Sequence, residues 1–163
     1  MIPGTPFHLG IAVRDLDRAM RNYASLFGLE HWATLHTEGE TIFRGRPARA
    51  IQEIGFARWG DSYLELVEPV SGDGPASDFL RHHGEGAFHV GYFYEDELGP
   101  NVLPEYEVEW EAWLNGELRA INFDTFGDLG LQIEFVVASG RDDFEAWMAG
   151  ARRLPPPPQF GRQ

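Results

Sequence analysis

Two His-x-Gly motifs and two later glutamates are the residues of this sequence whose types and spacing could do chemistry. His8 and His89 each stand two residues before a glycine in an alternating apolar run, and Glu65 and Glu134 each lie in a later alternating run. Two imidazoles and two carboxylates suit a divalent cation such as Mg, Mn, Fe, Co, Ni or Zn, and disfavour soft copper sites. Without a cation, two carboxylates in one cavity would repel each other.

The alternation of side chains predicts where these four groups point. His8 shares its strand face with Gly10 and Ala12, while the bulky residues of that run face the other way. A period of two indicates a half-buried strand. If the apolar faces pack against helices, the small-residue faces line a shared cavity with room for an ion or ligand. The other histidines have no repeated partner, and we interpret them as surface or loop residues: His31, His36, His82 and His83.

The elements that must position the four groups occur twice along the chain. The first unit reads as a strand at 7–13, a helix from Leu16 to Phe27 capped by Asp15 and Gly28, and strands at 30–36, 50–59 and 62–68, with a loop at 44–49. A linker at 70–75 and a short helix at 77–83 follow. The second unit reads as strands at 88–94, 106–113, 117–124 and 129–137, with a hairpin turn at Asn115-Gly116. We interpret this order as an internal duplication.

The chain length of 163 residues predicts one domain. We place the domain at 1–154, with module one at about 5–70, module two at about 86–137 and a C-terminal helix at about 140–153. Residues 155–163 read as an extended, proline-rich tail. Gly99 and Pro100 allow at most a short turn where the second module would carry its helix.

Charge and missing residue types exclude several functions. The net charge of -13 makes nucleic acid and anionic membrane surfaces poor partners. The chain has no Cys, so thiolate metal sites and cysteine nucleophiles are excluded, and it has no Lys, so Schiff-base chemistry is excluded. We expect no secretory signal, no membrane span and a cytoplasmic protein. Glu107, Glu109 and Glu111 read as a solvated strand face.

Residues 7–17, together with the helix that ends Tyr-Ala-Ser-Leu-Phe-Gly-Leu at 23–29, resemble the opening of the vicinal oxygen chelate superfamily. That superfamily includes glyoxalase I, methylmalonyl-CoA epimerase, extradiol dioxygenases and bleomycin-resistance proteins. Residues 63–69 and 78–89 are similar to its epimerase-like branch. The resemblance implies an α+β fold in which two βαβββ modules form one curved mixed sheet around a central cavity. It also implies four metal-ligand positions: His8, Glu65, His89 and Glu134.

The resemblance leaves three functions open. A His, Glu, His, Glu set resembles bacterial glyoxalase I, whereas the epimerases usually carry Gln at the position of Glu65. We expect one divalent metal and an isomerase, epimerase or lyase that moves a proton next to a carbonyl, with Glu134 or Glu65 as the base. The alternatives are a non-catalytic small-molecule binder of the resistance type and an iron-dependent extradiol-type dioxygenase.

The substrate is expected to be a small molecule. We expect four aromatic residues to line its pocket: Tyr92, Trp110, Trp113 and Phe123. Arg44, Arg46, Arg49 and Arg58 could recognise an anionic substrate, but the strong negative charge favours a neutral, aromatic or apolar one. Modules of this superfamily often pair across chains, so a homodimer is compatible with the resemblance.

Overall fold

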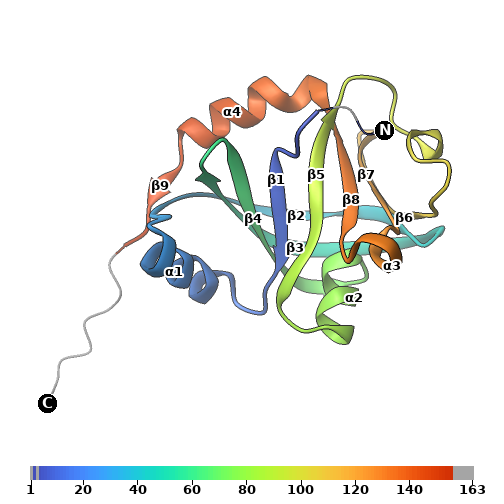
Figure 1. Ribbon diagram of the computed structural model, residues 1–163. Coiled ribbons are helices and arrows are strands. Elements are labelled where there is room, and N and C mark those ends of the chain that lie inside the picture. The colour runs from blue at the N-terminus through green and yellow to red at the C-terminus, as the bar shows by residue number, and fades with distance from the viewer. Residues whose placement is uncertain (1, 3, 156–163) are drawn as a thin grey trace, which may run out of the picture.

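The computed structural model describes residue 2 and residues 4–155, and its strands form one closed, curved mixed sheet (Figure 1). Around the ring the order is β3-β4-β1-β5-β8-β7-β6-β2, and β2 pairs back onto β3. The strands are β1 (His8–Ala12), β2 (His31–Phe43), β3 (Arg46–Trp59), β4 (Ser62–Gly72), β5 (Gly86–Tyr94), β6 (Val108–Leu114), β7 (Glu117–Phe123) and β8 (Gln132–Val137).

The ring is built from two equivalent halves. β1 pairs in parallel with β4, β5 pairs in parallel with β8, and the halves join through the antiparallel β1–β5 pair. The first half carries helix α1 (Leu16–Phe27), whose N-terminus is capped by Asp15 and which ends at the left-handed Gly28. Between β5 and β6, the described residues 95–107 form only the 3-10 turn η1 (Pro100–Val102). The predicted α+β fold of two βαβββ modules around one sheet is confirmed.

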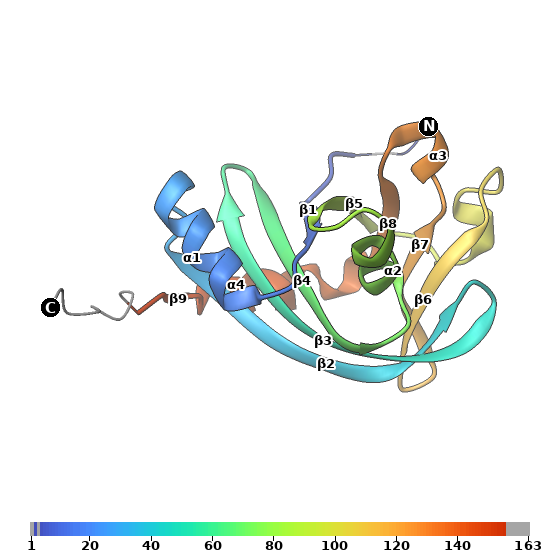
Figure 2. The ribbon, with the colours of Figure 1, turned by 90° about the horizontal axis from the view of Figure 1, so that it is seen from below.

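The loop predicted at 44–49 is wrong, because β2 and β3 continue into a long hairpin. Only Arg44 and Gly45 form the turn, with φ angles of 51° and 71°. This left-handed pair is the type I′ geometry that suits a two-residue hairpin turn. The extended hairpin reaches across to the second half (Figure 2), where Thr41, Ile42 and Phe43 pair with Ala112, Glu111 and Trp110 of β6. That pairing closes the ring.

Glu109 corrects the expectation of a solvated glutamate face. Its exposed fraction is only 3%. The guanidinium of Arg44 donates hydrogen bonds to both carboxylate oxygens of Glu109, at 2.8 to 3.1 Å, and one to Asp78 of helix α2 (Pro75–His82). The backbone amide of Arg44 also donates to the Glu109 carbonyl. Glu109 is therefore the anchor that holds the hairpin tip against β6.

The C-terminal helix is shorter than predicted. Helix α4 covers Arg141–Ala149, and Gly150 ends it. Arg152 and Arg153 then form strand β9, which pairs with the start of β2. Two short elements, α3 (Phe126–Leu129) and η2 (Ala138–Gly140), flank β8. Of the predicted extended tail at 155–163, residues 156–163 lie outside the described residues.

Helix α4 closes one end of the ring with aromatic side chains. Phe144 packs against Phe56, Tyr63 and Phe7, with ring centroids 5.2, 4.9 and 5.5 Å apart. Trp147 packs against the same Phe56. None of the helices in the described part of the chain is long and apolar enough to cross a membrane.

Candidate metal centre

The central strands bring His8, His89, Glu65 and Glu134 together. His8 lies on β1, His89 on β5, Glu65 on β4 and Glu134 on β8, which are four adjacent strands of the ring. The exposed fractions of His8, His89 and Glu65 are 2%, 3% and 8%. The side chain of Glu134 is 12% exposed. Four polar groups that are far apart in the sequence therefore share one buried place.

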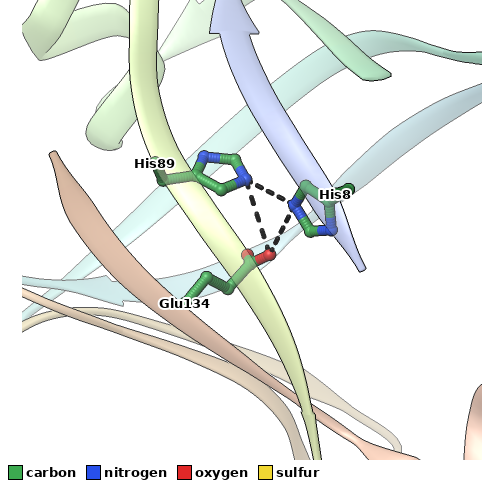
Figure 3. A group of neighbouring side chains, drawn as sticks. All are labelled: His8, His89 and Glu134. Atoms are coloured by element: carbon green, nitrogen blue, oxygen red, sulfur yellow. Dashed lines mark hydrogen bonds and ion pairs between the residues drawn. The ribbon is translucent and has the colours of Figure 1, made fainter. Parts of the chain in front are cut away.

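The imidazole Nε2 atoms point at one another (Figure 3). Those of His8 and His89 are 2.6 Å apart. Glu134 Oε2 lies 3.2 Å from His8 Nε2 and 3.6 Å from His89 Nε2. One ligand atom from each of these three residues lies within 4.8 Å of the others, so they form a compact group. Glu65 Oε2 lies outside that group but still approaches the same nitrogens, at 3.3 and 3.0 Å.

The glycines of the two His-x-Gly motifs make room for the rings. In the antiparallel β1–β5 pair, His8 stands opposite Gly91, and His89 stands opposite Gly10. A Cβ atom at Gly91 would lie 2.0 Å from Cε1 of His8, and one at Gly10 would lie 2.1 Å from Cε1 of His89. Each imidazole therefore rests on the glycine of the other motif, which explains why the two residues recur together.

The electrostatics of the cluster call for positive charge. Burial alone would lower the pKa of His8, but the charges of Glu65 and Glu134 outweigh it and raise the pKa from 6.5 to about 9. Burial would raise the pKa of Glu65, but the charge of His8 outweighs it and holds that pKa well below its ordinary value.

The donor set fits a divalent metal ion. Two imidazole nitrogens and two carboxylates are borderline-hard donors of the kind that such ions take in proteins. Glu65 Oε2 is buried and lies 3.3 and 3.0 Å from the two imidazole Nε2 atoms, without a well-aligned hydrogen bond to a described residue. Its lone pairs are therefore free for a cation. A doubly charged ion would also neutralise the two carboxylates.

A cavity of about 520 Å³ opens beside this cluster, and Glu65, His89 and Glu134 form part of its wall. The rest of the wall comes mainly from β2, β3, β6, β7 and the start of α2. Trp110 and Trp113, two of the four aromatic residues expected at a substrate pocket, line it. The size is typical of pockets for small organic ligands.

Tyr92 and Phe123 do not line this cavity. Both belong to the apolar cluster on the other face of the sheet, which includes Phe135. The reason is the alternation of side chains along a strand. Because Gly91 and Asn122 face the site, the neighbouring Tyr92 and Phe123 face away from it.

Sequence reasoning missed Asn122 and Thr41. Both line the cavity, and their exposed fractions are 2% and 9%. Asn122 is the paired neighbour of Glu134 across the β7–β8 ladder. A signal was present, because Asn122 is the single polar residue in the apolar run 120–123. Because side chains alternate along a strand, Asn122 faces away from the apolar side chains of Ile121 and Phe123 and toward the small-residue face.

The arginines considered for anion recognition, apart from Arg46, are paired with acidic residues. Arg44 is bound to Glu109 and Asp78, Arg49 to Glu38, and Arg58 to Tyr63 and Glu145. Among the described residues, no arginine lines the cavity at the metal centre. The cluster of basic residues seen in the sequence is therefore not an anion site on this wall.

Residues 7–98 match the Glyoxalase/Bleomycin resistance protein/Dioxygenase superfamily. The chain is 33% identical over 85 residues to the uncharacterized protein YqjC of Bacillus subtilis (strain 168), covering 52% of this chain and 54% of that protein. It is 26% identical over 96 residues to the mitochondrial methylmalonyl-CoA epimerase of Bos taurus, covering 59% and 49%. The chain spans about half the length of these curated relatives.

Solved structures share the fold. A variant of Streptomyces coelicolor methylmalonyl-CoA epimerase, in complex with 2-nitronate-propionyl-CoA, matches with a TM-score of 0.57 and 21% identity over 83% of this chain and 94% of that one. A 4-hydroxymandelate synthase mutant from the same organism matches with a TM-score of 0.52 and 17% identity over 85% and 39%. At these identities the likeness establishes the fold.

Proposed function

The chain belongs to the Glyoxalase/Bleomycin resistance protein/Dioxygenase superfamily, and from that premise we propose that it is a divalent-metal-dependent enzyme. Its reaction is proton transfer next to the carbonyl group of a small substrate, as in an isomerase, epimerase or lyase. The observation that carries the proposal is the convergence of two imidazole Nε2 atoms and two carboxylates in one buried cluster, three of whose residues line a cavity. His8, His89, Glu65 and Glu134 would hold the metal.

A divalent cation held by these residues would polarise a carbonyl oxygen and so make the neighbouring C–H bond more acidic. The protein's own contribution is a base placed beside that bond. Glu134 and Glu65 both reach the cavity, and they approach the histidines from the two ends of the strand row β4-β1-β5-β8. One carboxylate accepts the proton from carbon. Either the same carboxylate or its counterpart returns it, which allows isomerisation or inversion.

Elemental analysis of the purified protein tests the metal assignment. We expect about one equivalent of divalent metal in the parent protein and its loss in the Glu134→Gln and His89→Ala variants. A circular dichroism melt checks that each variant folds. Full metal occupancy that survives both changes would refute the assignment.

Hydrogen exchange tests the reaction. Hydroxyacetone, a small neutral hydroxyketone, is incubated with the metal-loaded protein in deuterium oxide, and the loss of its C–H signals is followed by NMR. We expect catalysed exchange that chelation abolishes and that Glu134→Gln, which removes both a metal ligand and the candidate base, slows by at least about 10²-fold. Exchange at the same rate in Glu134→Gln and Glu65→Gln would show that neither carboxylate is the base.

A second candidate function has a specific observation in its favour. The compact group of His8, His89 and Glu134 is a two-histidine, one-carboxylate set, which is a ligand set of non-haem iron oxygenases. Glu65 counts against this reading, because a fourth carboxylate beside the histidines would crowd the positions that oxygen and substrate need. Consumption of dissolved oxygen by the iron-loaded protein with a catechol would favour the dioxygenase. A non-catalytic binder predicts ligand affinity that persists without metal.

A further inference from the structure

The residues that line the cavity beside the metal centre indicate the chemical class of its ligand. We propose that it selects an uncharged substrate with a flat apolar body, and that Asn122, Trp110 and Thr41 read the polar groups of that substrate. The inference rests on the proposed function, because it concerns the same cavity and assumes that the reacting end of the substrate lies at the metal centre.

The cavity wall is mostly apolar. Its apolar side chains include Leu35, Ile54, Val67, Phe88, Trp110, Trp113 and Leu114. Trp113 and Leu114 are also 44% and 60% exposed, so apolar surface continues from the cavity to the solvent. Exposed apolar surface that runs into a cavity is typical of a ligand-binding site. A flat apolar body would bury this surface on entry.

The charges around the cavity oppose an anionic ligand. Among the described residues of the wall there are four carboxylates, Glu38, Glu40, Glu65 and Glu134, and no arginine, and the His36 of this wall is paired with Glu53. Arg49 pairs with Glu38, and Arg44 is bound to Glu109 and Asp78. A bound divalent cation would balance only Glu65 and Glu134. Phosphate or carboxylate groups on a ligand would therefore meet no counter-charge on this wall.

A row of polar groups leads away from the metal centre. Glu134 on β8 is the paired neighbour of Asn122 on β7, and Asn122 is the paired neighbour of Trp110 on β6. With neighbouring strands about 4.8 Å apart, the row spans about 10 Å from Glu134 to Trp110. Thr41 lies on β2, where it pairs with Ala112 of β6.

Three polar atoms near this row have no partner in the described part of the chain. They are Asn122 Oδ1, Trp110 Nε1 and Thr41 Oγ1, and all three are buried. A buried polar group without a hydrogen bond is costly, so each such group calls for an explanation. Because their residues all line the cavity, a ligand can satisfy them. The indole N–H can only donate, so the ligand must offer an acceptor there.

The first module has no row of polar groups equivalent to Glu134, Asn122 and Trp110. The positions equivalent to Asn122 and Trp110 in the first module are Phe56, which pairs with Glu65, and Ala33, which pairs with Phe56. Phe56 and Ala33 are buried in an apolar cluster with Phe144 of α4. Only the second module therefore presents polar groups beside its glutamate.

Two probes with the same metal-binding head test the charge preference. They are 6-hydroxy-2-naphthohydroxamate, which is uncharged at its far end, and 6-sulfo-2-naphthohydroxamate, which is anionic there. Both are titrated calorimetrically into the metal-loaded protein. We expect the hydroxy probe to bind at least about tenfold more tightly. Equal affinity, or no binding of either probe to the metal-loaded protein, would overturn the inference. A purified protein that takes up no divalent metal would instead refute the proposed function.

Variants test the polar row. We expect Trp110→Phe, which removes the indole N–H and keeps an aromatic ring, to weaken the hydroxy probe by about tenfold. Asn122→Ala should weaken it to a similar extent, with a thermal melt to establish that the variant is folded. Trp59→Phe is the matched control, because Trp59 packs against Phe27 outside the cavity. Unchanged affinity in folded Trp110→Phe and Asn122→Ala proteins would overturn the assignment of these residues.

Discussion

Replacing Gly91 by alanine is the most direct test of how the fold positions the metal ligands. The new Cβ would lie 2.0 Å from Cε1 of His8. Carbon atoms in contact prefer about 3.5–4.0 Å, so the imidazole must retreat by about 1.5 Å or the strands must separate. The ring has little freedom to retreat, because it contacts Phe7 and Phe56, with ring centroids 4.3 and 5.6 Å away.

The size of this displacement sets the expected effect. Metal-ligand distances hold within about 0.2 Å, so a shift of about 1.5 Å takes His8 Nε2 out of coordinating range. We therefore expect Gly91→Ala to lower divalent-metal affinity by at least about 100-fold, the upper end of what loss of an orienting contact costs. Overpacking adds about 1–3 kcal/mol of destabilisation, or a fall of about 2–12 °C in Tm.

Equilibrium dialysis followed by elemental analysis measures the affinity, and a circular dichroism melt measures stability. Gly10→Ala should reproduce the effect through His89, because its Cβ would lie 2.1 Å from Cε1 of that ring. Gly127→Ala is the control, since a Cβ there meets nothing within 4 Å. A folded Gly91→Ala protein that binds metal as tightly as the Gly127→Ala control would refute the reciprocal packing of rings on glycines.

Three further predictions concern the support of the site. Chelation of the bound metal should lower Tm, because a ligand at about 1,000 times its Kd stabilises the folded state by about 4 kcal/mol; an unchanged melt after EDTA dialysis would argue against a bound ion. Arg44→Met leaves the buried Glu109 unpaired and should cost about 3 kcal/mol in urea unfolding, whereas Arg49→Met, at an exposed pair, should cost less than about 1 kcal/mol. Phe144→Ala should cost about 3 kcal/mol through lost packing on Phe56, and a loss below about 1 kcal/mol would contradict the role of α4 as an end cap.

The sequence was sufficient to predict the fold and the meeting of His8 with His89. The repeated His-x-Gly motif carries both the ligand and the space for it, because each glycine faces the imidazole of the other motif. The alternation of side chains along each strand then decides which face of the sheet the two histidines occupy. These are local properties repeated twice, and a two-fold arrangement of equivalent strands turns them into one site.

Features that depend on contacts between distant strands were not predictable in the same way. The hairpin turn at Arg44 and Gly45 was hidden because an arginine gives no signal for a left-handed φ angle, which it adopts here with its side chain bound to Glu109. The burial of Glu109 depends on that same contact. Tyr92 is a different case, because alternation from His89 already places it on the far face.

The asymmetry between the two modules bears on how a duplicated fold acquires a specific ligand. Each half contributes a histidine, a glycine and a glutamate to the candidate metal centre, so these residues are arranged in the same way in both halves. The residues beside them differ, with Phe56 packed under α4 on one side and Asn122 facing a cavity on the other. The cavity wall therefore includes Asn122 of the second module but not the equivalent Phe56 of the first. Chemistry would reside in what the modules share, and selectivity in what they do not, so Asn122→Ala should affect ligand choice far more than metal content.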